Sequence, residues 1–231
     1  MSYTYQTVAV RSKDPDHNAP ARPLPPRSDR PHMTQNPPLW LTSVVTTLAQ
    51  HDVCVIPDAF SNEFCAALRA DLNSLPLRPA AVGRGQQRIH NSAIRNDNTV
   101  WLDGSSAAQQ DYLLAMEQLR GALNQQFFMG LAEYEAHYAV YPPGGFYQRH
   151  LDSFRGSNPR RVTTVFYLNE NWQADDGGEL RVYRDQDDGV GLGILPAQGT
   201  LVIFLSDRVP HEVKPGHRER LSIAGWFRVP A

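Results

Sequence analysis

The sequence predicts a mainly β fold, a double-stranded β-helix of the jelly-roll or cupin type, with supporting helices. The second half of the chain carries the pattern that predicts it, because short apolar or alternating runs are separated by turn signals rich in Gly, Pro and Asp. These runs are residues 134–141, 146–152, 161–168, 179–183, 191–195, 200–205, 209–213 and 219–227. Short strands in this number are typical of a jelly roll, and 231 residues can form one such barrel.

The chain divides into an N-terminal extension and one folded domain. Residues 1–38 hold eight prolines among polar and charged residues, a composition that cannot bury a core and therefore predicts disorder. The domain is expected over residues 39–231, with helical support over 39–132 and the barrel over 133–230. Met33 lies close to this boundary and is a candidate start of translation.

Three helices and one strand are expected in the supporting half. Residues 40–50 and 106–128 carry apolar side chains at helical spacing. A further helix is expected to follow Ser61, a suitable N-cap, and to run through Leu72. Val53–Ile56 has the pattern of a strand, and residues 78–103 are expected to form a long loop with several arginines.

Composition indicates a soluble cytoplasmic enzyme. The formal net charge is −2, which gives no basis for nucleic-acid binding, and no apolar run approaches the roughly 18 residues of a membrane span. No apolar segment near the N-terminus resembles a secretory signal. Cys54 and Cys65 lie in apolar segments, where buried reduced thiols are expected.

A pair of histidines and one aspartate have the spacing of a metal site. His150 and Asp152 would point to the same side of a strand, and His211 would come from a neighbouring strand. Two histidines and one carboxylate are the ligands of non-haem Fe(II) oxygenases. Arg220 opens the apolar run 221–227, where a buried guanidinium needs an anion such as the distal carboxylate of 2-oxoglutarate. These residues predict an Fe(II)/2-oxoglutarate dioxygenase with O2 as the other cosubstrate.

Several segments resemble, in order and spacing, the prolyl 4-hydroxylase family of these dioxygenases. They are residues 94–101, 147–152, 166–169, 177–181 and 206–213. The resemblance covers about residues 39–230 and is strongest toward hypoxia-inducible-factor prolyl hydroxylases and their bacterial relatives. Ala224, where animal members carry a hydroxyl residue, and the chain end at Ala231 both favour the bacterial relatives.

The resemblance implies a role for each of a set of residues. It implies that the iron ligands are His150, Asp152 and His211. It implies that the 2-oxoglutarate-binding residues are Arg220, Tyr167 and Tyr141. The substrate-binding residues that it implies are Arg95, Asp97, Trp101, Arg160 and Trp226. Core packing is the alternative role for the aromatic residues, and a solvated turn is the alternative for Arg95 and Asp97.

The reaction that the resemblance implies is hydroxylation of a prolyl residue at ring carbon 4 in a cytoplasmic protein, with succinate and CO2 as coproducts. Some bacterial relatives are similar to hydroxylases of elongation factor Tu, which is therefore the first candidate partner. Ascorbate is a further expected cofactor, and a monomer without nucleic-acid or membrane partners is expected. The alternatives are an oxygenase of the same fold acting on a free amino acid or other small molecule, and a non-catalytic cupin-like metal-binding protein.

Overall fold

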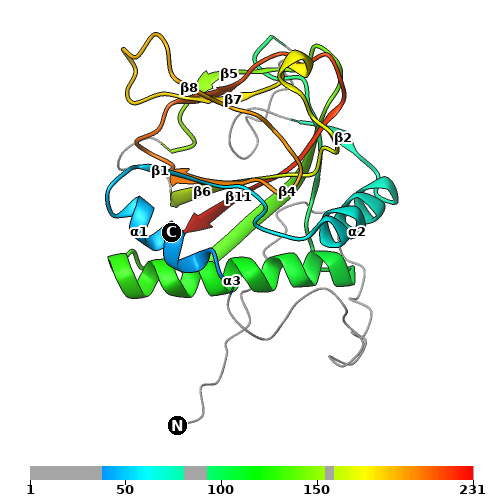
Figure 1. The fold of residues 1–231 in the computed structure, drawn as a ribbon. Coiled ribbons are helices and arrows are strands. Elements are labelled where there is room, and N and C mark those ends of the chain that lie inside the picture. The colour runs from blue at the N-terminus through cyan, green and yellow to red at the C-terminus, as the bar shows by residue number, and fades with distance from the viewer. Residues whose placement is uncertain (1–37, 81–92, 154–158, 231) are drawn as a thin grey trace.

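Two antiparallel sheets form the two layers of the computed structural model, which describes residues 38–80, 93–153 and 159–230 (Figure 1). The larger sheet consists, in spatial order, of β1 (Val53–Ile56), β9 (Leu201–Leu205), β6 (Arg160–Tyr167), β11 (Arg220–Arg228), β4 (Glu133–Tyr141), β3 (Asn98–Trp101) and β2 (Arg78–Pro79). The smaller sheet consists of β5 (Tyr147–His150), β10 (His211–Val213), β7 (Leu180–Val182) and β8 (Leu192–Ile194). Each of the strands predicted in the second half of the sequence overlaps one of these strands.

Three α-helices cover the outer face of the larger sheet (Figure 1). They are α1 (Leu41–Leu48), α2 (Asn62–Asn73) and α3 (Ala107–Phe127), and they confirm the helices predicted from periodicity. Ser61 caps α2 as predicted, since its side chain accepts a hydrogen bond from the backbone N–H of Phe64 at 3.3 Å. A short 3-10 helix, η3 (Ala174–Asp176), lies in the turn before β7.

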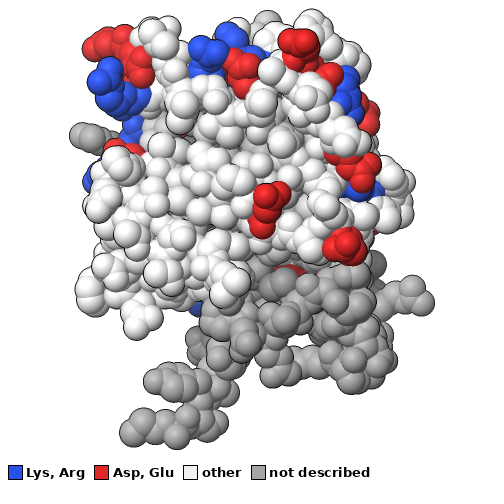
Figure 2. All heavy atoms as spheres, viewed as in Figure 1, with Lys and Arg blue, Asp and Glu red and all other residues white. Residues whose placement is uncertain are grey.

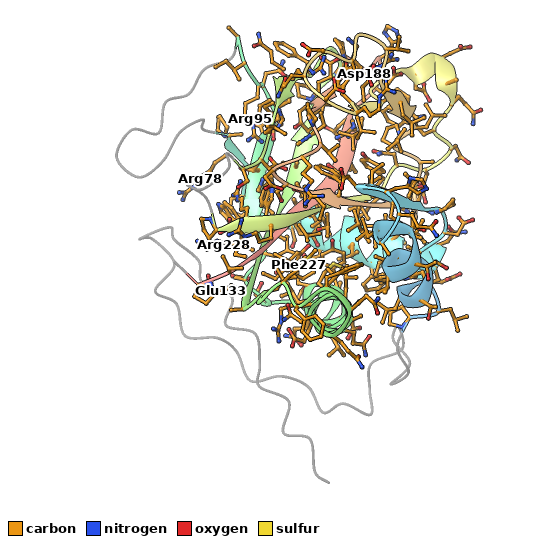
Figure 3. All side chains as sticks on the ribbon, turned by 90° about the vertical axis from the view of Figure 1, so that its left-hand side faces the viewer. Arg78, Arg95, Glu133, Asp188, Phe227 and Arg228 are labelled. Carbon is orange, nitrogen blue, oxygen red and sulfur yellow. The ribbon has the colours of Figure 1, made fainter. Side chains whose placement is uncertain are left out.

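The larger sheet separates two hydrophobic clusters, because alternate residues of its strands point to opposite faces. On β4, Tyr138 packs toward the helices, whereas Ala139 and Tyr141 face the smaller sheet. Phe227 of β11 likewise lies on the side of α3 (Figure 3). The helices therefore stabilise one face of the sheet and leave the other face to form a pocket with the smaller sheet.

The structure differs from the prediction in two places. Residues 98–101, which lie in the segment expected to form a long loop, form β3 because β4 offers them a full set of strand partners, from Asn98–Val140 to Trp101–His137. Strand β5 ends at His150, so Asp152 lies in the bend that follows and not on the strand itself. The predicted disordered extension, apart from Pro38, lies outside the described residues.

On the face shown in Figure 2, charged side chains of both signs lie mainly along the upper and right-hand margins, and the middle of that face is mostly uncharged. Cys54 and Cys65 are buried and free, as predicted. Over residues 38–80, 93–153 and 159–230, no helix is both long and apolar enough to cross a membrane.

Candidate active site

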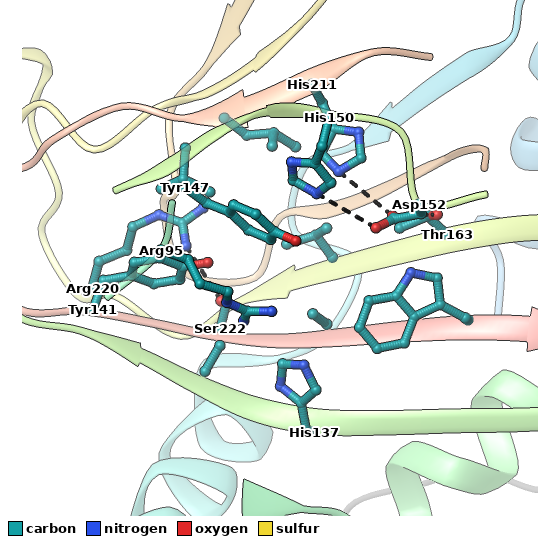
Figure 4. A pocket seen from close by; sticks show the side chains of 16 residues that line it. Arg95, His137, Tyr141, Tyr147, His150, Asp152, Thr163, His211, Arg220 and Ser222 are labelled. Atoms are coloured by element: carbon teal, nitrogen blue, oxygen red, sulfur yellow. Dashed lines mark hydrogen bonds and ion pairs between the residues drawn. The ribbon is translucent and has the colours of Figure 1, made fainter. Parts of the chain in front are cut away.

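The smaller sheet brings the two predicted histidine ligands together. His150 is the last residue of β5 and His211 is the first residue of β10, and the two are paired across the sheet. The Nε2 atoms of His150 and His211 each lie 3.5 Å from an oxygen of Asp152 (Figure 4). The three ligand atoms lie within 4.8 Å of one another, so a single metal ion could be held by all three.

Backbone contacts set the orientation of both imidazoles. The Nδ1–H of His150 donates to the carbonyl oxygen of Gln148 at 2.7 Å, and that of His211 donates to the carbonyl oxygen of Val209 at 3.0 Å. A carbonyl can only accept, so each Nδ1 carries a proton and Nε2 is the ring nitrogen that each histidine can offer to a metal. Burial lowers the pKa of His211 to about 4, which keeps this imidazole neutral and able to ligate.

Asp152 supplies the negative charge of the cluster. Burial alone would raise the pKa of this carboxyl, but the nearby His211 and His150 hold it below its ordinary value. The donor set is therefore two imidazoles and one carboxylate, which fits Fe(II) and leaves positions open for further ligands.

Tyr147, on the same strand as His150, and Arg95, which precedes β3, lie beside the His150 imidazole. The ring of Tyr147 stacks on the imidazole of His150 at a centroid distance of 3.7 Å, and the guanidinium of Arg95 lies 4.5 Å from the centre of the Tyr147 ring. Nε of Arg95 donates to a carboxylate oxygen of Asp97 at 2.7 Å, and its Nη2 pairs with the other oxygen. Arg95 lines the pocket, whereas buried Asp97 holds Arg95 in place from behind.

Arg220 lies at the other end of the pocket (Figure 4). Its side chain is buried between the rings of Tyr141 and Tyr167, whose centres are 5.1 and 4.9 Å from the guanidinium carbon. Nε donates to the carbonyl oxygen of Gly178 at 2.9 Å, and Nη1 contacts Ser222 Oγ at 3.4 Å. Gly178 has a φ of +69°, a conformation that glycine adopts readily and that aims its carbonyl at the guanidinium.

Two buried polar atoms at this end have no hydrogen-bond partner among the described residues: Arg220 Nη2 and Tyr167 Oη. Burial raises the pKa of Tyr167 to about 12, so its hydroxyl keeps its proton and remains a donor. Unsatisfied buried donors are costly, and two of them beside a positive charge fit the carboxylate of a small acid such as 2-oxoglutarate.

The residues predicted to meet the substrate gather on the strands next to the metal cluster. Trp226 of β11 lies on the pocket wall, with the guanidinium of Arg160 stacked 3.7 Å from its ring centre. Arg160 is also paired with Glu135, at 2.8 Å. The ring centres of Trp101 and Trp226 are 6.4 Å apart.

Among the residues that the structure describes, sixteen line the pocket, and they include seven of the eleven predicted site residues. Those seven are Arg95, Tyr141, His150, Asp152, His211, Arg220 and Trp226. Tyr167, Asp97, Trp101 and Arg160 contact lining residues from behind or beside them.

The lining also includes residues that the sequence analysis did not identify, among them His137, Tyr147, Thr163 and Ser222. Strand alternation could have indicated two of them. His137 is four residues before Tyr141 on β4, and Thr163 is four residues before Tyr167 on β6, so each shares a face with a predicted site residue.

Known proteins share both this fold and its sequence motifs. The sequence model of the 2OG-Fe(II) oxygenase superfamily matches residues 136–228. The crystal structure of a Pseudomonas putida prolyl-4-hydroxylase superposes with a TM-score of 0.74 and 44% identity, over 83% of this chain and 100% of that one. A prolyl hydroxylase from Trichoplax adhaerens was solved in complex with a hypoxia inducible factor oxygen degradation domain peptide fragment. It superposes with a TM-score of 0.69 and 26% identity, over 81% of this chain and 88% of that one.

Human Egl nine homolog 1 is 29% identical over 231 aligned residues, which cover 92% of this chain and 53% of that protein. The chain thus spans about half the length of this curated relative. The solved relatives confirm the predicted double-stranded β-helix, and the family match with the histidine–aspartate cluster confirms Fe(II), 2-oxoglutarate and O2 as what the site uses. The likeness to the Pseudomonas putida enzyme extends over the whole of that solved chain, so this chain belongs to the prolyl hydroxylase family of the 2OG-Fe(II) oxygenase superfamily.

Proposed function

We propose that this protein hydroxylates a prolyl residue of a polypeptide at ring carbon 4, using Fe(II), 2-oxoglutarate and O2 and releasing succinate and CO2. One observation carries the proposal: the histidine–aspartate metal cluster and Arg220, whose Nη2 has no hydrogen-bond partner among the described residues, line the same pocket, on a chain similar over its domain to a prolyl-4-hydroxylase. His150, Asp152 and His211 would hold the iron.

The register of β4 and β11 arranges the pocket along one direction. Arg220 is opposite Tyr141 and Ala224 is opposite His137. Trp226 is two residues after Ala224 on β11 and therefore points to the same face. The anion-binding end is therefore separated from the aromatic end by the small side chains of Ser222 and Ala224. This order would place 2-oxoglutarate beside Arg220 and the substrate beside Trp226.

The chain's own residues bind and orient both substrates. Arg220 and the Tyr167 hydroxyl would bind the distal carboxylate of 2-oxoglutarate, while Tyr141 packs against the same guanidinium. The indole of Trp226, with Trp101 and His137 beside it, offers a flat apolar wall that suits a pyrrolidine ring. Bound iron would supply the oxidising chemistry.

We infer that the substrate is a protein loop. The Trichoplax adhaerens relative was solved with a peptide fragment, which supports an extended polypeptide as the occupant of the aromatic end. Elongation factor Tu remains the first candidate, with the protein acting in the cytoplasm as a monomer.

The test compares three substrates with the protein loaded with Fe(II), 2-oxoglutarate and O2. Intact elongation factor Tu, a Pro-containing peptide from it and free L-proline are incubated separately, and succinate and the gain of one oxygen atom are measured by mass spectrometry. We expect the intact protein to give the highest kcat/KM, and D152A to be inactive. Preferential hydroxylation of free proline would favour a small-molecule oxygenase. Absence of substrate-dependent succinate in all three reactions would favour a non-catalytic metal-binding protein.

A further inference from the structure

Two buried hydroxyl groups connect the carboxylate of Asp152 to the larger sheet. The Oγ1 of Thr163, on the pocket face of β6, lies 2.8 Å from Asp152 Oδ2. The same Oγ1 lies 2.8 Å from the Oγ of Ser206, which directly follows β9. Thr163 and Ser206 are 1% and 0% exposed, so water does not compete freely for either hydroxyl.

The ionised carboxylate fixes the direction of this chain of hydrogen bonds. A carboxylate only accepts, so the Thr163 hydroxyl must donate to Asp152. Thr163 then has only its lone pairs left for Ser206, and Ser206 must donate to Thr163. Ser206 is itself held by its backbone, because its N–H donates to the carbonyl oxygen of Arg161 at 3.0 Å and its carbonyl accepts from the N–H of Ser153 at 3.1 Å.

The position of Asp152 explains why such support matters. His150 is held in the strand ladder by its pairing with His211, whereas Asp152 lies two residues beyond the end of β5, in the bend that follows. Contacts of its side chain therefore contribute to its position. The Thr163 hydroxyl fixes the carboxylate from the opposite sheet, and the Ser153–Ser206 hydrogen bond ties the bend to the same place.

We propose that Thr163, supported by Ser206, is a positioning residue that preorganises Asp152 for metal binding. The proposal rests on the assignment of Asp152 as an iron ligand under the proposed function. Partners that orient a metal-ligating side chain commonly contribute about 10- to 100-fold to metal affinity. Loss of the Thr163 donor should weaken metal binding by this order without removing any ligand.

The neighbouring residue on β6 provides a matched control. Thr164 points to the opposite face, where its Oγ1 makes a 2.7 Å hydrogen bond with the hydroxyl of Tyr134. It is as deeply buried as Thr163, so T164V also removes one buried threonine hydroxyl and its hydrogen bond. A general loss of stability would affect both variants, whereas a loss of metal affinity should appear only in T163V.

The experiment measures Mn(II) binding to the full chain by electron paramagnetic resonance, with melting temperature recorded for each variant. We expect T163V to bind Mn(II) about 10- to 100-fold more weakly, T163S to bind like the parent, and T164V to be less stable with unchanged affinity. S206A should show a smaller loss than T163V in the same direction.

Equal Mn(II) affinity in folded T163V and T164V would overturn the proposal. If T163V does not fold, S206A decides the question, because parental affinity in folded S206A would show that the hydroxyl pair does not position Asp152. D152A separates this result from the ligand assignment itself. Parental Mn(II) binding by D152A would refute the metal site of the proposed function, whereas loss in D152A without loss in T163V would refute only the role of Thr163.

Discussion

The guanidinium of Arg220 is buried without a carboxylate partner among the residues that the structure describes. Its contacts there are all to neutral groups: the Gly178 carbonyl, the Ser222 hydroxyl and the rings of Tyr141 and Tyr167. A buried cation is destabilising until an anion reaches it. Binding of 2-oxoglutarate should therefore stabilise the fold, and replacing Arg220 should remove this effect.

The contacts of Arg220 set the expected magnitude. Its planar fork can hold the Gly178 carbonyl through Nε and still offer Nη2 to the carboxylate, which the single ammonium of a lysine cannot do in the same geometry. R220K should lose about 1.4 kcal/mol of 2-oxoglutarate binding, or tenfold in affinity. R220M also loses a charged hydrogen bond worth about 1.5–3 kcal/mol, so its affinity should fall about a hundredfold or more.

Thermal unfolding with and without 2-oxoglutarate measures this linkage. At a concentration about 100 times the dissociation constant, the ligand should stabilise the parent by about 2.7 kcal/mol. For a domain of this size, that corresponds to a rise of about 5–10 °C in melting temperature. R220M should show almost no rise at the same concentration. Arg218 is the matched control, since it is exposed and paired with Asp176 at 2.9 Å, and R218M should keep the parental rise. A parental rise in R220M, or its loss in R218M, would refute the assignment of Arg220 as the anchor.

Three further predictions concern the metal, the core and pH. H150A and H211A should each lose Mn(II) binding and turnover, because each histidine supplies one of the three ligands that the described residues offer; parental Mn(II) titration in either variant would remove that histidine from the site. Gly225→Ala should lower the free energy of unfolding in urea by about 1–3 kcal/mol, because the added Cβ would lie 2.1 Å from the Tyr134 hydroxyl; unchanged stability would contradict the close packing. Burial lowers the pKa of His137 to about 4 from 6.5, so the unfolded chain binds a proton that the folded protein does not, and stability should fall as pH drops from 6.5 to 4. Replacing His137 with Leu should remove about 3 kcal/mol of that pH-dependent loss, and an equal slope in the variant would contradict it.

Strand alternation made most of the barrel predictable. Runs of β-branched and aromatic residues bounded by Gly, Pro and Asp coincide with the strands because they are buried on at least one face. Strand β3 could not be predicted from alternation, because it is a strand through its pairing with β4 and not through its composition. Asp152 was expected on a strand because a two-residue spacing fits one, but β5 ends two residues earlier.

The site was predictable where a residue's own chemistry indicates its role. Histidines and an aspartate at metal-ligand spacing, and an arginine at the start of a buried strand, identify themselves in this way. The roles of Arg160 and Asp97 could not be predicted in this way, because they depend on which residues the tertiary fold brings beside them. Arg160 is paired with Glu135 and stacked on Trp226, and Asp97 is paired with Arg95. The charge that Arg160 offers to a substrate is therefore already partly balanced.

One face of the larger sheet packs against the helices in the core, and the other face lines the pocket. On β6, Thr164 bonds to Tyr134 among the core residues beneath the helices, while Thr163 bonds to Asp152 at the pocket. On β11, Gly225 makes room for that same Tyr134 hydroxyl, while Trp226 forms the pocket wall. Adjacent residues thus serve different purposes because a strand alternates its side chains, not because the site is distant from the core. Substitutions one position apart should therefore separate folding from metal or substrate binding in this protein, and a pair such as T163V and T164V tests that separation with a single change in chemistry.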